Sequence, residues 1–136
     1  MLRDTRILIC TAANNDYFHY LEALVFSILK NSRHCSILIS LVNVPNYKIK
    51  WLKNLNLDIT IDALYIDFPS KEVERGYCSS KRVDLLSSEY SLSFDWTFYF
   101  DANILVNRNL NDFFKDKKDY DSVIIFDSNH ITLKMN

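Results

Sequence analysis

The chain has 136 residues, of which 49% are hydrophobic, a formal net charge of −1 and a single glycine. This length and hydrophobic content predict one domain over residues 1–136, with enough apolar material for a core. The near-neutral charge, without a basic run interleaved with aromatic residues, excludes nucleic acid as the main partner. One glycine, Gly76, cannot form the Gly-rich phosphate loops GxxxxGK or GxGxxG.

The three cysteines Cys10, Cys35 and Cys78 are widely spaced and odd in number. That spacing indicates neither a disulfide framework nor a metal knuckle, and free thiols are typical of a reducing compartment. The apolar runs are too short for a signal peptide or a membrane span. We therefore expect a cytoplasmic protein without a transmembrane segment.

In the first half of the chain, apolar runs alternate with segments of helical periodicity. Asn15 or Asp16 would cap the first helix. Pro45 opens the second helix, and its anchors would be Tyr47, Trp51, Leu52 and Leu55. The predicted elements are a strand over 6–10, a helix from about 16 to 32, a strand over 36–42, a helix over 45–55 and a strand over 59–66.

In the second half, Pro69 and Gly76 predict a loop over residues 67–80. The next elements are a helix over 80–90 with Val83, Leu85 and Leu86 facing inward, a buried central strand over 97–100, and the run Ile104–Val106, which resumes the sheet. They are followed by an amphipathic piece over 111–114, a charged loop over 115–121 and a buried strand over 122–126. The alternation predicts an α/β fold with a mostly parallel sheet.

Asp101, Ala102 and Asn103 directly follow the predicted central strand. In open α/β sheets, ligands bind at the carboxyl ends of the strands, and the small Ala102 leaves room for a close approach. Ordinary turn chemistry also selects Asp and Asn after a strand, so the triplet alone leaves both interpretations open.

The run TAANNDY, residues 11–17, follows the first strand. The ring of Tyr17 could stack on a nucleobase, worth about 1–3 kcal/mol per base, while Thr11 and Asn14 could hydrogen-bond its edge. Helix starts select the same polar residues, so a simple cap remains an equal alternative.

Lys81 and Arg82 form a basic pair near a predicted helix start, where they oppose the helix dipole. This conflict favours a role in ligand binding for Arg82, or else for Lys81, over the alternative of a solvated basic pair. A guanidinium fork suits a diphosphate better than a point charge does.

Together, TAANNDY, the helix that carries Arg82, and the run FYFDANILV resemble the motifs of glycosyltransferase family 8, the glycogenin-like nucleotide-sugar enzymes. The resemblance extends over residues 7–126 and implies a truncated, three-layer Rossmann-like GT-A fold, of which the chain would supply the N-terminal half. It also implies a nucleoside diphosphate-sugar donor, with a UDP-sugar favoured, an unknown acceptor, and retention of anomeric configuration.

The resemblance further implies roles for particular residues. Thr11, Ala12, Asn14 and Tyr17 would hold the base, Arg82 the phosphates, and the triplet Asp101, Ala102 and Asn103 the donor and a divalent metal, Mn²⁺ or Mg²⁺. The family carries a second carboxylate where this chain has Asn103, and a hard cation prefers anionic oxygen, so metal binding through Asp101 and Asn103 should be weakened. Asn14 replaces the usual Asp of the base loop, which leaves the preference for uracil open. No catalytic base or nucleophile is identified.

Two further interpretations remain. A non-catalytic, truncated glycosyltransferase-like domain would bind a nucleotide or a protein partner, and the face left by truncation would favour a homodimer or a second chain. An unrelated flavodoxin-like module could also use acidic strand ends, but it would not account for TAANNDY and FYFDANILV together.

Overall fold

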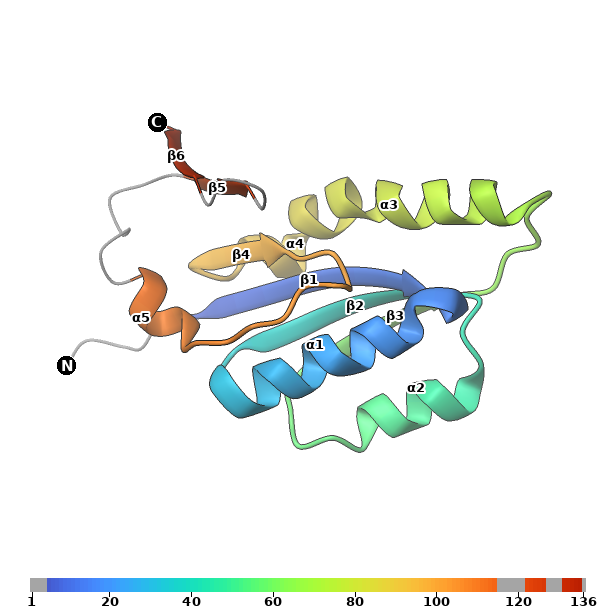
Figure 1. The fold of residues 1–136 in the computed structure, drawn as a ribbon, viewed down its shortest axis with the longest axis horizontal. Coiled ribbons are helices and arrows are strands. Elements are labelled where there is room, and N and C mark those ends of the chain that lie inside the picture. The colour runs from blue at the N-terminus through green and yellow to red at the C-terminus, as the bar shows by residue number, and fades with distance from the viewer. Residues whose placement is uncertain (1–4, 115–121, 127–130, 136) are drawn as a thin grey trace.

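The computed structural model describes residues 5–114, 122–126 and 131–135 (Figure 1). Four parallel strands form its main sheet, in the order β3-β2-β1-β4. Their bounds are Ile7–Asn14 for β1, Ser36–Val42 for β2, Ile59–Leu64 for β3 and Trp96–Tyr99 for β4. The predicted α/β class with a parallel sheet is confirmed.

Helices cover both faces of this sheet, which gives three layers (Figure 1). On one face lie α1, Phe18–Asn31, and α2, Asn46–Lys53. On the other face lies α3, Lys71–Ser87, followed by the short α4, Glu89–Leu92.

Strand β1 is central to both hydrophobic clusters. Ile7 and Ile9 pack in the cluster of α1 and α2, whereas Leu8 and Cys10 pack in the cluster of α3. This division follows from the alternation of side chains along a strand, and burial on both faces explains the continuous apolar run.

The first strand and the first helix both differ from the prediction. Strand β1 runs on to Asn14, so the prediction that it ends at residue 10 is wrong, because residues 11–14 continue the pairing with β2. A 3₁₀ turn, Asn15–Tyr17, precedes α1, and its cap is Asn14 instead of Asn15 or Asp16. The side-chain oxygen of Asn14 accepts a hydrogen bond from the backbone N–H of Tyr17 at 3.2 Å. An Asn at this position satisfies one of the free N–H groups at the helix start.

The second helix follows Pro45 as predicted, but it ends at Lys53 instead of Leu55, and one of its four predicted anchors is wrong. Tyr47 is 70% exposed, so its predicted place in the core is wrong. Leu52 is buried as predicted, and so is Ile49, because both lie on the face turned to the sheet. Trp51 and Leu55 pack against the edge of the same cluster, as predicted.

Helix α3 replaces most of the predicted loop over 67–80. Its cap is Ser70, whose hydroxyl accepts from the backbone N–H of Val73 at 3.2 Å, and Gly76 lies inside the helix. An isolated glycine costs a helix only about 1 kcal/mol relative to alanine, which the packing of α3 on the sheet offsets. The predicted inward position of Val83 is also wrong, since it is 69% exposed, whereas Leu85 is buried.

Strand β4 lies at the edge of the main sheet, pairing with β1, so its predicted central position is wrong. Its residues are only partly buried. The predicted continuation of the sheet over Ile104–Val106 is wrong as well, because this segment has no strand structure. Val106 is buried against the α1 cluster, while Leu105 is 63% exposed.

The remaining elements are a short helix and a separate hairpin. Helix α5 spans Leu110–Phe114, and β5, Ser122–Phe126, pairs antiparallel with β6, Ile131–Met135. Strand β5 was predicted, but it does not join the parallel sheet in the described residues, and β6 was not predicted. The charged loop predicted over 115–121 lies outside the described residues. In the described part of the chain, no helix has the length and apolar character needed to cross a membrane.

Candidate functional site

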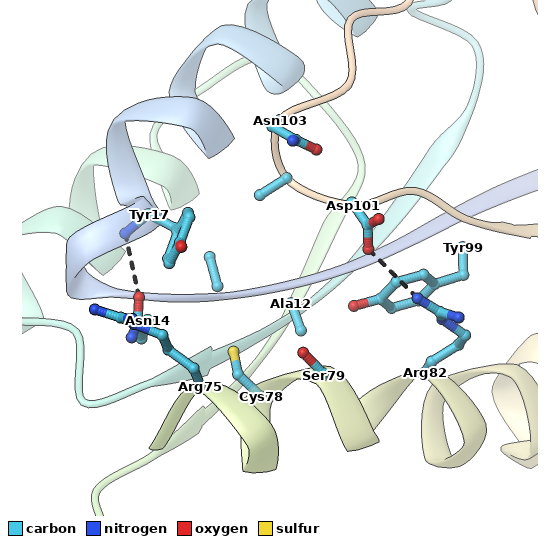
Figure 2. A pocket seen from close by; sticks show the side chains of 12 residues that line it. Ala12, Asn14, Tyr17, Arg75, Cys78, Ser79, Arg82, Tyr99, Asp101 and Asn103 are labelled. Atoms are coloured by element: carbon cyan, nitrogen blue, oxygen red, sulfur yellow. Dashed lines mark hydrogen bonds and ion pairs between the residues drawn. The ribbon is translucent and has the colours of Figure 1, made fainter. Parts of the chain in front are cut away.

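A cleft of about 310 Å³ opens at the carboxyl ends of β1 and β4, beside α3 (Figure 2). All the donor-binding residues predicted from the sequence except Thr11 line it: Ala12, Asn14, Tyr17, Arg82, Asp101, Ala102 and Asn103. Residues that the sequence analysis did not select complete the lining: Ala13, Arg75, Cys78, Ser79 and Tyr99. The two motifs, more than 80 residues apart in the chain, therefore meet at one cleft.

Thr11 lies elsewhere. Its side chain is fully buried, and its hydroxyl has no hydrogen-bond partner among the described residues. Because Ile9 and Ala13 pack in the α1 cluster, the alternation along β1 turns Thr11 toward that face and away from α3. A hydrogen bond from its hydroxyl to a base in the cleft is therefore not available in this arrangement.

Asn14 and Tyr17 form one end of the cleft. Both ends of the Asn14 amide are engaged: its oxygen accepts from Tyr17, and its Nδ2 donates to Glu74 Oε1 at 2.8 Å. Asn14 is 1% exposed, whereas Tyr17 is 42% exposed and its ring lies 5.8 Å from that of Tyr20. The first residue is thus a buried support, and the second presents an aromatic surface.

Glu74 on α3 is the carboxylate that holds this end together. It is 5% exposed and accepts from Asn14 on Oε1 and from Asn43 Nδ2 on Oε2 at 3.0 Å, with Lys71 Nζ 3.5 Å from Oε1. The hydrogen bond from Asn43 lowers the pKa of Glu74, burial opposes this by raising it, and Asn14 and Lys71 lower it further. The net result is a lowered pKa, so the buried group stays ionised.

Asn43 connects the same carboxylate to the end of β3. Its φ of 56° lies in the left-handed region, which Asn tolerates better than most residues. Its amide donates to the carbonyl of Ile66 at 2.7 Å and accepts from the N–H of Ile66 at 2.8 Å. Through Glu74, the carboxyl ends of three neighbouring strands are fixed to the first turn of α3.

Arg82 and Asp101 form the other end of the cleft. Arg82 Nη2 lies 3.6 Å from Asp101 Oδ1, and both side chains are more than half exposed, at 56% and 62%. The Arg82 guanidinium also lies 5.1 Å from the centre of the Tyr99 ring. Burial, and next the charge of Asp101, raise the pKa of Tyr99 to about 12, so this phenol stays protonated. Exposed ion pairs are worth little, so both charges remain available to a ligand.

Lys81, the alternative to Arg82, does not line the cleft. Its ammonium lies 5.0 Å from the centre of the Tyr77 ring and 3.9 Å from Asp84 Oδ2, and its side chain is 14% exposed. Of the basic pair, the structure therefore brings only Arg82 to the cleft.

The loop that carries Asp101 is attached to the C-terminal end of α1. Ser27 Oγ accepts from the N–H of Val106 at 2.8 Å, and Asn31 Nδ2 donates to the carbonyl of Val106 at 2.8 Å. Ser32 Oγ donates to the carbonyl of Arg108 at 2.7 Å and accepts from the N–H of Leu110 at 3.0 Å. These bonds hold an irregular segment in place without a strand partner.

The donor set for a divalent metal is incomplete. Asp101 offers one carboxylate, already beside Arg82, and Asn103 offers a neutral amide. No group of three or more His, Cys, Asp or Glu side chains that could hold a metal occurs within the described residues. A hard cation takes six or more oxygen ligands, preferably anionic ones, so these residues do not fit a metal held by the protein alone.

Glu74 and Arg75 were missed from the sequence, because the segment was predicted as a loop. The available signal was Ser70 followed by Glu72 and Glu74, since a capping serine with acidic residues in the next turn is typical of a helix start.

The three-layer architecture and the parallel sheet define the class: the chain has a Rossmann-like, GT-A-type glycosyltransferase fold. It is similar to the solved glycosyltransferase GlyE of Streptococcus pneumoniae in its apo form, with a TM-score of 0.55 and 15% identity over 82% of this chain and 26% of that one. An active-site mutant of LgtC has a TM-score of 0.58 and 17% identity, over 79% of this chain and 41% of that one. The bifunctional glycosyltransferase WbbM has a TM-score of 0.54 and 12% identity, over 83% of this chain and 21% of that one.

At these identities the likeness defines the fold, and the chain spans less than half the length of each of these proteins. No family model and no curated protein matches the sequence.

Proposed function

We propose that this domain binds a nucleoside diphosphate-sugar, with a UDP-sugar favoured, and takes part in transferring the sugar to an acceptor. One observation carries the proposal: Tyr17, after β1, and Asp101, after β4, line the same cleft, with Arg82 beside Asp101. An aromatic surface at one end and a guanidinium at the other match the two chemically different ends of a nucleoside diphosphate.

In this proposal the base stacks on Tyr17, which is exposed enough to accept it. Arg82 exchanges its weak contact with Asp101 for the diphosphate, and its charge stabilises the negative charge that develops on the leaving diphosphate. Asp101 and Asn103 then face the sugar end of the donor. Ala12 and Ala102, which have short side chains, leave space along the floor of the cleft.

A divalent cation, Mn²⁺ or Mg²⁺, would need phosphate oxygens of the donor to complete its ligand shell, because Asp101 and Asn103 supply only one charged oxygen donor group. We therefore expect cation binding to be weak without nucleotide. Asn103→Asp should raise the affinity for Mn²⁺, measured by titration calorimetry with and without UDP. An unchanged dissociation constant in both titrations would show that residue 103 is not a ligand.

The second candidate function is nucleotide binding without sugar transfer. The amide at Asn103 and the incomplete donor set for a metal favour it. The two functions differ in turnover: a transferase consumes the donor sugar in the presence of acceptor or water, whereas a binding domain leaves it intact.

Thermal-shift titration with UDP, GDP and their sugars, with and without Mn²⁺, tests the shared part of both proposals. We expect stabilisation by nucleotide that Arg82→Ala weakens in every titration and that Asp101→Ala weakens where the sugar or Mn²⁺ is present. Arg33→Ala, which removes an exposed arginine that does not line the cleft, is the matched control. Stabilisation that is equal in all four proteins would refute binding in this cleft, and chromatographic analysis of the donor then separates transfer from binding.

A further inference from the structure

We infer that Arg75 hydrogen-bonds the edge of the nucleobase and selects bases that present acceptors there, uracil and guanine, over adenine and cytosine. The inference deepens the proposed function and rests on it. Arg75 takes the position of base-contacting residue because the motif's own candidates are not available to a base: Thr11 is buried outside the cleft, and the amide of Asn14 is already hydrogen-bonded.

Asn14 is not free to contact a base. Its oxygen is occupied by the N–H of Tyr17, its Nδ2 donates to Glu74, and the residue is 1% exposed. Thr11 is fully buried and does not line the cleft. Neither Thr11 nor Asn14, which both lie in β1, therefore presents an available donor or acceptor to a ligand in the cleft.

Arg75 lies next to Asn14, and its guanidinium has no hydrogen-bond or ion-pair partner among the described residues. It follows Glu74 in α3, so the bond between Glu74 and Asn14 holds this turn of the helix against the base end of the cleft. Figure 2 shows the Arg75 side chain extending toward Asn14, below Tyr17. The side chain is exposed and, among the described residues, makes no hydrogen bond, ion pair or ring contact. Its guanidinium donors are thus available to a ligand in the cleft.

The two arginines of α3 serve different ends of the cleft. Arg75 and Arg82 are seven residues apart, about 10 Å along a helix, and both line the cleft. Arg82 is beside Asp101, whereas Arg75 is at the end formed by Asn14 and Tyr17. A nucleotide whose diphosphate lies at Arg82 and whose base stacks on Tyr17 brings the base, and not the phosphates, to Arg75.

Arginine can only donate hydrogen bonds, and this property sets the selection. Guanine and uracil carry a carbonyl acceptor, O6 and O4, where adenine and cytosine carry an amino donor. Guanine can therefore accept two hydrogen bonds from a guanidinium, on O6 and N7, whereas adenine keeps only the N7 acceptor beside its amino group. A donor facing a donor leaves both unsatisfied on binding, which lowers affinity. Stacking on Tyr17 cannot supply this discrimination, since every base has a π-face.

The test compares UDP, GDP, ADP and CDP by titration calorimetry on the whole chain. We expect UDP and GDP to bind at least about fivefold more tightly than ADP and CDP. Arg75→Gln, whose amide both donates and accepts, should bring the four dissociation constants to within about twofold of one another. Arg82→Ala should weaken all four by a common factor and keep their order, and Arg33→Ala should change nothing.

Two results would overturn the inference while leaving the proposed function intact. One is an Arg75→Gln variant that keeps the wild-type order of affinities. The other is an Arg75→Gln variant that weakens all four nucleotides equally, which would make Arg75 a phosphate ligand. Failure of the wild-type protein to bind any of the four would instead refute the proposed function, and the inference with it.

Discussion

Replacing Asn14 by aspartate tests the buried network around Glu74. The substitution exchanges the Nδ2 donor, 2.8 Å from Glu74 Oε1, for a second carboxylate oxygen at a site where Glu74 is 5% exposed. Losing a hydrogen bond to a charged group costs about 1.5–3 kcal/mol, and two like charges 4 Å apart repel by about 4 kcal/mol at an effective dielectric constant of 20. Uptake of one proton limits the repulsion, at about 1.4 kcal/mol per pKa unit. We expect Asn14→Asp to lower the free energy of unfolding by about 3 kcal/mol at pH 7.

The pH dependence of this loss follows from the direction of each pKa shift. In the wild type, the lowered pKa of Glu74 contributes stability that is present above the unfolded pKa and is lost as the pH falls through the folded pKa. In Asn14→Asp, two adjacent carboxylates raise the folded pKa of one of them, so the destabilisation is present at neutral pH and is relieved as the pH falls. The difference in stability between the two proteins should therefore shrink from pH 7 toward pH 4.

Urea denaturation at several pH values measures both effects. Asn15→Asp is the matched control, because Asn15 is exposed and its side-chain oxygen accepts from Lys48 Nζ at 2.7 Å, where a carboxylate is tolerated. Combining Asn14→Asp with Glu74→Gln restores a donor facing an acceptor and should recover part of the loss. A variant as stable as the wild type at pH 7, or a loss that does not change with pH, would refute the reasoning.

Two further predictions concern stability and thiol reactivity. Ser32→Ala removes the buried hydroxyl that bonds the carbonyl of Arg108 and the N–H of Leu110, so it should lower the free energy of unfolding by about 2–3 kcal/mol in urea denaturation and speed amide exchange at Leu110. Ser93→Ala removes an exposed local hydrogen bond and should lower it much less. Equal losses in the two variants would contradict the anchoring role of Ser32. Burial raises the pKa values of Cys10, Cys35 and Cys78 to about 11, 12 and 11. None of these thiols should therefore react with a disulfide reagent at pH 8 until urea unfolds the chain. Rapid labelling of the native protein would disprove their burial.

Short sequence patterns were sufficient to predict the strands that are buried on both faces and the edge of the sheet where the cleft lies. The run SILISLV between polar segments gives β2 its observed bounds, since a strand buried on both faces needs a continuous apolar sequence. Asp101 and Tyr17 both follow parallel strands, whose carboxyl ends share one edge of a sheet, and both line the cleft. Whether these residues bind a donor remains a prediction.

The wrong secondary-structure predictions and the missed site residue share one physical cause: contacts between distant parts of the chain determine these features. Gly76 suggested a loop, but α3 is stabilised by packing on the sheet. A Cβ added at Gly76 would meet nothing within 4 Å, so the structure does not require a glycine at this position. Glu74 is buried because Asn14, 60 residues earlier, donates to it. The apolar run Ile104–Val106 suggested a strand, but Val106 donates its N–H to Ser27 and accepts from Asn31, and these hydrogen bonds hold the run along α1 instead.

The length of helix α1 fixes the distance between the two sides of the cleft. Its N-terminal end adjoins Tyr17, and its C-terminal end, 14 residues and about 21 Å later, bonds the segment that follows Asp101. A single residue inserted into this helix would rotate one end against the other by about 100° and misalign the two sides. An insertion between α2 and β3, at the opposite edge of the sheet from β4, would leave their spacing unchanged.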